Sequence, residues 1–446
     1  MTNKQLNIEL NDIRAINNAN IDLNGITVIT GENGCGKSTI SKLAYNIIKT
    51  SVAYDEIVTL RLVKQLDSYI GALNSLTHEF SYFLFEKDYK YLRGLFNNYY
   101  VNVFQLNTNK YYDFIINIIS KLKRIIENHE LKTDFSEQEQ RYQKIKSFVI
   151  SIIEMGNDLE NNNLLELLSL LKVNIENKIA YYYNLKDERP LSILNNNINQ
   201  AFYDAPIPEN YNINEYEVPI IDKENEKLMP VHSVQNVAYI DTPMILGMDF
   251  PDNRPHWKDL NRILKKRHKR QATNSIDSIL HEEIINGNVK IEENAIADKN
   301  FVYKRADGKE FDLLECATGL KSFSILQILY KNGFLNDKSM LIIDEPEVHL
   351  HPQWVVEYAR LLVLLNKNLG VRFLIASHHP DMISAIKYIF EKENEEKDHY
   401  KLNFYLAERT EDSFLYDYRS LGTEVDEIFD SFNIALNRID QYGTND

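Results

Sequence analysis

Cysteine and long apolar runs are scarce in this chain, and both shortages limit what the protein can be. Two cysteines among 446 residues cannot build a disulfide framework or a four-cysteine zinc site. No apolar run approaches the ~20 residues needed to span a bilayer. The opening residues, MTNKQLNIELND, lack the apolar core of a signal peptide. We therefore expect a cytoplasmic protein.

Positive charge is also in deficit, with 50 Lys and Arg against 65 Asp and Glu and a net charge of −15. A protein that coats nucleic acid with its whole surface is usually basic. Any such contact must therefore come from a local patch or from a partner. The chain is 44% hydrophobic and 26% charged, as globular proteins are, which excludes disorder throughout. At ~100–200 residues per domain, its length predicts two or three structural units.

The N-terminal segment predicts strands, a glycine-rich loop and a helix in succession. Residues 6–10 and 19–23 alternate apolar and polar side chains, as half-buried strands do. Residues 26–30 form a continuous β-branched run typical of a strand buried on both faces. The loop that follows reads GENGCGKS and satisfies the pattern G-x-x-x-x-G-K-[ST] in the strand-to-helix context that a P-loop needs.

This P-loop predicts a binding site for ATP and Mg²⁺. Glycines let backbone N–H groups close around phosphates, and the helix N-terminus adds positive potential. We expect Lys37 to reach the β- and γ-phosphates and Ser38 to place its hydroxyl on Mg²⁺. The predicted nucleotide-binding residues of this segment are Gly31, Glu32, Asn33, Gly34, Cys35, Gly36, Lys37, Ser38 and Thr39.

A second apolar run, MLIIDE, ends in two adjacent carboxylates, the form expected of a Walker B strand. Successive strand residues point to opposite faces, so Asp344 and Glu345 cannot do the same work. We expect Asp344 to hold Mg²⁺, directly or through water. Glu345 is the predicted general base that polarises the attacking water.

Two further segments complete the predicted site. CATGLKS (316–322) opens a predicted helix, with Thr318 as a plausible N-cap and Gly319 allowing a phosphate close to the backbone. IASHHP (375–380) ends another apolar strand, where a histidine can sense the γ-phosphate. We favour His378 for this role, with His379 as the alternative.

These motifs resemble those of ABC-type ATPases. Residues 8–39 are similar to the start of RecF/SMC/OLD-type ATPases. MLIIDEPEVHLHPQW and IASHHP resemble bacterial AAA-family ATPases found in anti-phage systems such as Septu, PARIS and the retron-associated ATPases. The resemblance implies an α/β P-loop NTPase fold of the ABC ATPase class and heads that dimerise head to tail around ATP. It also implies nucleotide contacts from Thr318, Gly319 and Lys321 of the signature helix, and an approach by Arg14.

This sequence also departs from the family pattern. The signature reads ATGLKS in place of an LSGGQ-like string, and Lys321 lies where many relatives carry Gln or Glu, so turnover is expected to be slow or partner-dependent. The Q-loop residue stays open among Asp241, Gln65 and Gln105. A metal site at residues 347–351 is disfavoured, because the resemblance places that loop at a subunit interface.

The order of motifs predicts an interrupted ATPase head. Residues 1–50 hold the P-loop, residues 51–235 form a mostly helical insertion with apolar stripes at helical spacing, and residues 236–446 hold the signature helix, Walker B and the histidine. A basic stretch lies on a predicted helix over 256–270 and suits nucleic acid, an acidic partner or a solvated face. It consists of Arg262, Lys265, Lys266, Arg267, Lys269 and Arg270.

The sequence supports three interpretations of purpose. The first is the ATPase subunit of an anti-phage defence system that controls a separate nuclease or toxin, because no second catalytic centre is recognisable in the chain. The second is a DNA repair or recombination ATPase of RecF/SMC type. The third is a scaffold in which ATP binding matters more than turnover.

Overall fold

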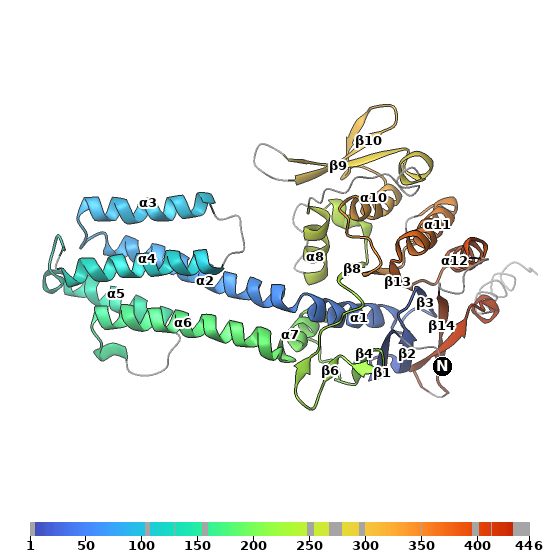
Figure 1. Ribbon diagram of the computed structural model, residues 1–446, viewed down its shortest axis with the longest axis horizontal. Helices are drawn as coiled ribbons and strands as arrows, with labels where there is room; N and C mark the ends of the chain where they lie inside the picture. The colour runs from blue at the N-terminus through green and yellow to red at the C-terminus, as the bar shows by residue number, and fades with distance from the viewer. Residues whose placement is uncertain are drawn as a thin grey trace, which may run out of the picture. The chain divides into compact units, whose positions relative to one another are not determined.

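The computed structural model describes most of the chain, in segments separated by short gaps. The described residues are 5–102, 108–128, 130–153, 159–247, 254–266, 279–293, 299–348, 350–394, 401–411 and 413–430. They belong to two compact units. We call residues 1–52 and 190–446 the head, and residues 53–189 the helical unit (Figure 1).

The head is built around strands and flanking helices. Its strands are β1 (Leu6–Ile13), β2 (Ile16–Asp22), β3 (Ile26–Thr30), β4 (Tyr211–Glu215), β5 (Val218–Pro219), β6 (Ile221–Asp222), β7 (Lys227–Leu228), β8 (Asn236–Ile240), β9 (Gly287–Glu293), β10 (Lys299–Arg305), β11 (Glu310–Asp312), β12 (Ser339–Asp344), β13 (Arg372–Ala376), β14 (Leu402–Arg409) and β15 (Tyr416–Gly422). Its helices are α1 (Lys37–Val52), α7 (Ser192–Ala201), η3 (Pro243–Gly247), α8 (Pro255–Leu264), η4 (Ile279–Ile284), α10 (Thr318–Lys331), α11 (Pro352–Leu369) and α12 (Pro380–Glu393).

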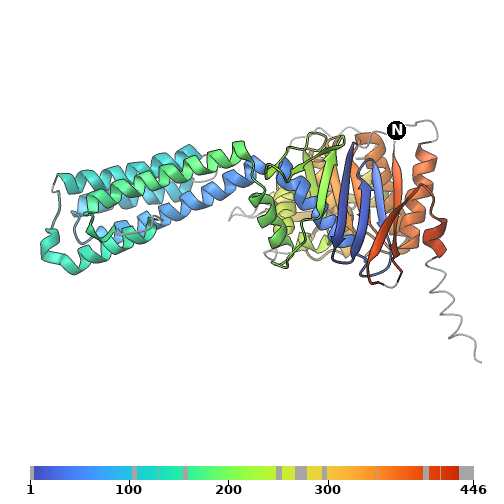
Figure 2. The same cartoon turned by 90° about the horizontal axis from the view of Figure 1, so that it is seen from below.

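The largest sheet of the head has the strand order β5-β4-β1-β2-β15-β14-β3-β13-β12-β8. Figure 2 shows its N-terminal strands β1 and β2, in blue, beside the C-terminal strand β15, in orange. The five strands from β14 to β8 run parallel to one another. Every residue of β3 and β12 is buried, which agrees with the continuous apolar runs in the sequence.

The register of the parallel strands brings their carboxyl ends to one edge of the sheet. Ala376 at the end of β13 lies opposite Asp344 of β12 on one side and Ile29 of β3 on the other. Helix α1 starts directly after the loop that follows β3 and packs on β8, β12 and β13. The predicted P-loop, the predicted Walker B carboxylates and the histidine segment therefore follow three neighbouring strand ends.

The helical unit consists of long helices packed side by side (Figure 1). They are α2 (Tyr54–Phe80), α3 (Glu86–Asn102), α4 (Thr108–Glu127), α5 (Glu139–Ile152) and α6 (Leu164–Glu188), with the short helices η1 (Phe135–Gln138) and η2 (Leu159–Asn161). Both apolar stripes expected from the sequence are buried here, on α4 and on α6. Their members are Ile115, Ile118, Ile119, Leu122, Ile125 and Ile126, then Leu164, Leu167, Leu168 and Leu171.

The compact helical unit is shorter than the insertion expected over 51–235. Residues 190–235 group with the head. Strand β4 extends the large sheet by pairing antiparallel with β1, and α7 packs on α1. Alternate residues of β4 (211–215) are buried, as in a strand with one face against the core. Pairing with β1 buries that face, which explains why this segment belongs to the head.

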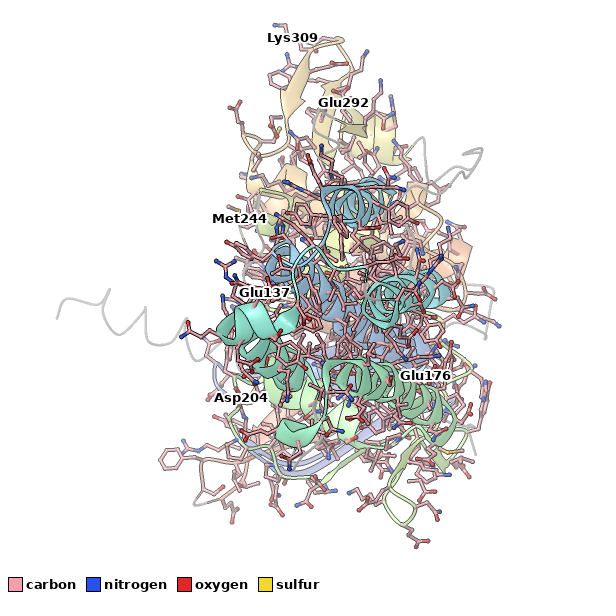
Figure 3. All side chains as sticks on the ribbon, turned by 90° about the vertical axis from the view of Figure 1, so that its left-hand side faces the viewer. Glu137, Glu176, Asp204, Met244, Glu292 and Lys309 are labelled. Carbon is pink, nitrogen blue, oxygen red and sulfur yellow. The ribbon has the colours of Figure 1, made fainter. Side chains whose placement is uncertain are left out.

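A smaller sheet and a short amphipathic helix complete the head. Strands β11, β10 and β9 form a three-stranded antiparallel sheet, and Figure 3 marks Glu292 on β9 and Lys309 in the turn before β11. Helix α8 ends at Leu264, with Lys265 as its C-cap, whereas the sequence predicted a helix to residue 270. Residues 267–278 lie outside the described residues.

Candidate functional site

The predicted P-loop connects the buried strand β3 to helix α1. Gly31, Gly34 and Gly36 adopt φ values of 150°, 88° and 101°, in the region that favours glycine. A Cβ on Gly36 would lie 2.7 Å from Cγ1 of Ile16, which sits at the start of β2. This loop can therefore wrap closely only because glycine occupies these positions.

Lys37 is buried and its ammonium group turns back into the loop. Its Nζ donates hydrogen bonds to the carbonyl oxygens of Gly31 at 2.8 Å and Glu32 at 2.9 Å. The backbone N–H of Thr39 donates to the carbonyl of Gly36 as α1 begins. The loop thus places the Lys37 ammonium close to the N-terminus of α1. A positive side chain beside a helix N-terminus is a setting that binds phosphate.

The remaining loop residues differ in exposure. Glu32, Asn33 and Ser38 are exposed, and Thr39 is partly buried. Cys35 is fully buried, with its Sγ 3.5 Å from the hydroxyl oxygen of Tyr418. That hydroxyl also donates to the carbonyl of Cys35 at 3.1 Å, so β15 supports the P-loop.

Asp344 ends strand β12 in a nearly closed environment. Tyr239 of β8 donates a hydrogen bond to its Oδ2 at 2.7 Å, and its Oδ1 has no hydrogen-bond partner among the described residues. Burial raises the pKa of Asp344, against the opposing effect of hydroxyls from Ser41, Tyr239 and Ser38. An unpartnered buried carboxylate oxygen next to the Ser38 hydroxyl is chemically suited to Mg²⁺, a hard cation that prefers oxygen ligands.

Glu345 leaves the strand in a strained conformation. Its φ of 47° is left-handed, and its N–H donates to the carbonyl of Ala376 at 2.8 Å. The carboxylate is partly exposed, and its Oε1 lies 3.6 Å from Nδ1 of His378. Nδ1 of His379 instead lies 4.0 Å from Asp381 at the start of α12. The geometry therefore favours His378 over His379 as the partner of Glu345.

Glu347 was not among the residues proposed for nucleotide chemistry, yet it contacts the histidine segment. Its side chain is 3% exposed. Its Oε1 accepts hydrogen bonds from the Ser377 hydroxyl at 2.9 Å and from the backbone N–H of His378 at 3.2 Å. The sequence motifs could not reveal this contact, because it joins the segment after β12 to the segment after β13. These segments come together only through the pairing of the two strands.

The predicted signature residues have internal contacts of their own. The N-cap of α10 is Ala317, so Thr318 is the first helical residue and not the cap that we expected. A Cβ on Gly319 would lie 3.1 Å from the Trp354 ring, which explains the glycine by packing. Lys321 is buried and donates from Nζ to the carbonyl of Leu314 at 2.7 Å. Their contact with nucleotide on a second copy stays a prediction.

The structure separates the three candidates for the Q-loop residue. Asp241 follows β8, whose last residue pairs with Ile343 of β12, so it lies next to Asp344. Gln65 lies on α2 in the helical unit, and Gln105 lies outside the described residues. Asp241 itself accepts hydrogen bonds from the side chains of Trp257 and His256.

Two further predictions concern charged side chains of the head. The guanidinium of Arg14 lies 4.6 Å from the centre of the Phe202 ring, in a cation–π contact. Arg262 of the basic stretch forms an ion pair with Asp259 at 2.9 Å. Lys265 and Lys266 follow α8, whereas Arg267, Lys269 and Arg270 lie outside the described residues.

The described part of the chain holds no other metal centre and no membrane helix. It contains no group of three or more His, Cys, Asp or Glu side chains that could hold a metal ion. His349, part of the disfavoured metal site, lies outside it. Within the same residues, none of the helices combines the length and the apolar character that crossing a membrane requires.

Comparison with known proteins finds a family and a curated protein that are similar to this chain. The family described as "AAA ATPase domain" matches residues 6–383. The chain is 26% identical over 394 residues to "Endonuclease GajA" of Bacillus cereus (strain HuB5-5), a match that covers 80% of this chain and 52% of that protein. The chain thus spans about half the length of this curated relative.

Solved structures of Smc heads also match. An Smc head domain with an extended coiled coil, bound to the C-terminal domain of ScpA and derived from Pyrococcus furiosus, is 10% identical, with a TM-score of 0.33 over 98% of this chain and 99% of that chain. An SmcHead bound to the C-winged helix domain of ScpA is also 10% identical, with a TM-score of 0.34 over 95% and 98% of the two chains.

Proposed function

Because the chain belongs to the AAA ATPase domain family, we propose that it hydrolyses ATP in a Mg²⁺-dependent reaction at the edge of its parallel sheet. The observation that carries this proposal is the meeting of three groups at neighbouring strand ends. They are the P-loop with Lys37, the buried carboxylate of Asp344 with an unpartnered oxygen, and Glu345 beside His378.

The residues divide the work according to their surroundings. The ammonium of Lys37 exchanges carbonyl oxygens of the loop for phosphate oxygens, which attract it more strongly because they carry full charge. Ser38 and Asp344 hold Mg²⁺, which would neutralise charge on the phosphates when bound. Glu345 accepts the proton of the attacking water, and its partial exposure leaves room for that water. His378 contacts the γ-phosphate from the next strand.

Phosphate release measured with purified protein tests this assignment. We expect hydrolysis that needs Mg²⁺, is lost in Lys37→Ala together with ATP binding, and falls by about 10²–10⁴-fold in Glu345→Gln while ATP binding persists. The matched control is Glu357→Gln, which changes a carboxylate paired with Arg360 on α11. Wild-type hydrolysis by the Glu345 variant would remove Glu345 as the base.

We further propose that ATP closes two heads into a dimer and that this dimer controls a separate nuclease or toxin in an anti-phage defence system. The matched relative is named an endonuclease, and this chain spans about half of its length. The proposal also places the protein in the cytoplasm. Mild affinity purification with ATP, from cells that express the neighbouring genes, tests it by mass spectrometry. A stoichiometric nuclease or toxin is the expected result.

The repair interpretation predicts a different outcome of the same experiments. A dimer that purifies without a partner, and whose hydrolysis DNA strongly stimulates, would favour it. Charge reversal at Lys265 and Lys266 at fixed salt then tests direct contact with nucleic acid, because each lost phosphate contact lowers the salt dependence of binding. Undetectable turnover with Lys37 still required for function would favour the scaffold.

A further inference from the structure

We propose that Glu347 is a positioning residue that fixes His378 against the ATP site by joining the ends of strands β12 and β13. This inference rests on the proposed ATP hydrolysis. The observation that supports it differs from those behind the proposed hydrolysis. It is a buried carboxylate that accepts hydrogen bonds from the histidine segment.

The burial of Glu347 is costly and needs an explanation. Its side chain is 3% exposed, and among the described residues no lysine or arginine forms an ion pair with it. Its Oε2 has no hydrogen-bond partner in that part of the chain. Carboxylates in this position are normally paired, because removing the charge from water is unfavourable. An apolar side chain at this position would lower the free energy of the folded state more than the carboxylate does, so the carboxylate needs a functional reason.

The hydrogen bonds of Glu347 define the path of the chain at the end of β13. Its Oε1 accepts from the Ser377 hydroxyl, and that hydroxyl in turn accepts from the N–H of His379 at 3.2 Å. The N–H of Ser377 donates to the carbonyl of Ile29 at 3.1 Å, in the strand that leads into the P-loop. One carboxylate thus joins the Walker B turn to the histidine segment, and the serine continues the link to β3.

The same carboxylate holds the backbone of His378 and lies close to its imidazole. Its Oε1 accepts the backbone N–H of His378 at 3.2 Å and lies 3.8 Å from Nδ1 of the ring. Nδ1 also lies 3.6 Å from Oε1 of Glu345. One ring nitrogen therefore faces two carboxylates, which leaves Nε2 as the atom to meet a phosphate. A carboxylate that accepts the N–H of a histidine commonly sets the orientation of its ring, and a small shift of this imidazole would bring Nδ1 within that range.

Steady-state kinetics with four variants test the inference. We expect Glu347→Ala to lower kcat by about 10–100-fold, the range for lost supporting contacts. The Kd for ATP should rise no more than it does in His378→Ala, because the P-loop contacts are unchanged. Glu347→Gln keeps an acceptor for Ser377 and for the His378 N–H, so it should recover part of the loss. Ser377→Ala removes one donor and should show a smaller defect, and Glu357→Gln is the matched carboxylate control.

A double-mutant cycle separates positioning from a general loss of structure. If Glu347 acts through His378, the double variant Glu347→Ala/His378→Ala should be no slower than His378→Ala alone. Additive losses, or wild-type kcat in a folded Glu347→Ala protein, would overturn the inference while leaving the proposed ATPase intact.

A second readout applies if the wild type binds ATP without turnover. The ratio of the Kd values for ADP and ATP, measured by calorimetry with Mg²⁺, then reports sensing of the γ-phosphate. Glu347→Ala and His378→Ala should reduce this ratio equally. A ratio unchanged by Glu347→Ala and reduced by His378→Ala would overturn the inference. Failure of the wild type to bind ATP would instead reject the proposed function and, with it, this inference.

Discussion

Asp344 carries its charge in a place that does not solvate it. The residue is 8% exposed, Tyr239 satisfies one carboxylate oxygen, and the other oxygen has no hydrogen-bond partner among the described residues. Burial accordingly raises its pKa. A raised pKa means that ionisation disfavours the folded state relative to the unfolded chain. This cost is understandable if a bound cation offsets it.

We predict that Asp344→Asn raises the melting temperature in buffer without Mg²⁺ or nucleotide. The neutral amide removes the cost of burying a charge, and each kcal/mol is worth roughly 2–4 °C in a domain of 150–250 residues. The increase in melting temperature should be largest above the pKa that Asp344 has in the folded protein. It should vanish below the pKa of the unfolded chain, about 3.9, where the wild-type carboxyl is also neutral.

Calorimetric scans between about pH 3 and pH 8 check this prediction, because they include the region below the unfolded pKa of about 3.9. Asp113→Asn changes an exposed carboxylate on α4 and should leave the melting temperature nearly unchanged. Mg²⁺ with ATP should reverse the order of stability, because only the wild type can bind the cation through a carboxylate. An Asp344→Asn protein that melts below the wild type in metal-free buffer would contradict the argument.

At the scale of elements, the P-loop depends on a strand that lies almost 400 positions later in the chain. Tyr418 of β15 donates to the carbonyl of Cys35 at 3.1 Å, and its hydroxyl is 3.5 Å from the Cys35 thiol. Burial is the main reason that the pKa of Tyr418 is raised, so this hydroxyl remains a donor at physiological pH. Strand β15 reaches the loop because it pairs parallel with β2.

We predict that Tyr418→Phe weakens ATP binding several-fold without unfolding the head. The substitution leaves the ring in place and removes one buried hydrogen bond, which is worth about 1–3 kcal/mol when its partner stays buried. Tyr112→Phe is the matched control, because its hydroxyl donates to Glu176 at 2.7 Å within the helical unit and makes no contact with the P-loop. Fluorescent ATP-analogue titrations compare the two. Equal affinities for both variants would show that the loop does not need this support.

At the scale of the whole molecule, the proposed dimer requires that two heads share nucleotide through helix α10. Within one chain, Gly319 packs near Trp354 and Lys321 donates to the carbonyl of Leu314. Packing therefore accounts for Gly319, and a hydrogen bond within the chain accounts for Lys321. Thr318, at the start of α10, is partly buried and remains the most accessible of the three. Gly319 and residues 321–330 of α10 are buried within the chain, so we expect a nucleotide contact at this end of the helix to come from Thr318.

We predict that Glu345→Gln forms an ATP-dependent dimer and that Lys37→Ala remains monomeric under the same conditions. Blocked hydrolysis should trap the closed form, whereas loss of phosphate binding should prevent it from forming. Light scattering coupled to gel filtration, with ATP or ADP and Mg²⁺, measures the mass directly. Thr318→Trp in the Glu345→Gln background should abolish the dimer if the first turn of α10 meets the second copy. A dimer of equal stability in ADP would argue against a nucleotide switch.

The sequence by itself was sufficient for the local parts of this protein. The P-loop, the strands that flank it and the apolar stripes of α4 and α6 depend on spacing within short segments, and the structure contains all of them. His378 lies 3.6 Å from Glu345, whereas its predicted role as the sensor of the γ-phosphate stays a prediction. These features are encoded by neighbours in the chain, so pattern and residue type reveal them.

Tertiary structure decided the contacts between segments that are distant in sequence. Tyr239, Tyr418 and Glu347 support Asp344, the P-loop and His378, and none of them belongs to a pattern that predicts this support. The place of residues 190–235 in the head likewise depends on the pairing of β4 with β1. Strand register and burial determine these contacts, because a residue's partner across a sheet is fixed by the fold and not by its neighbours along the chain.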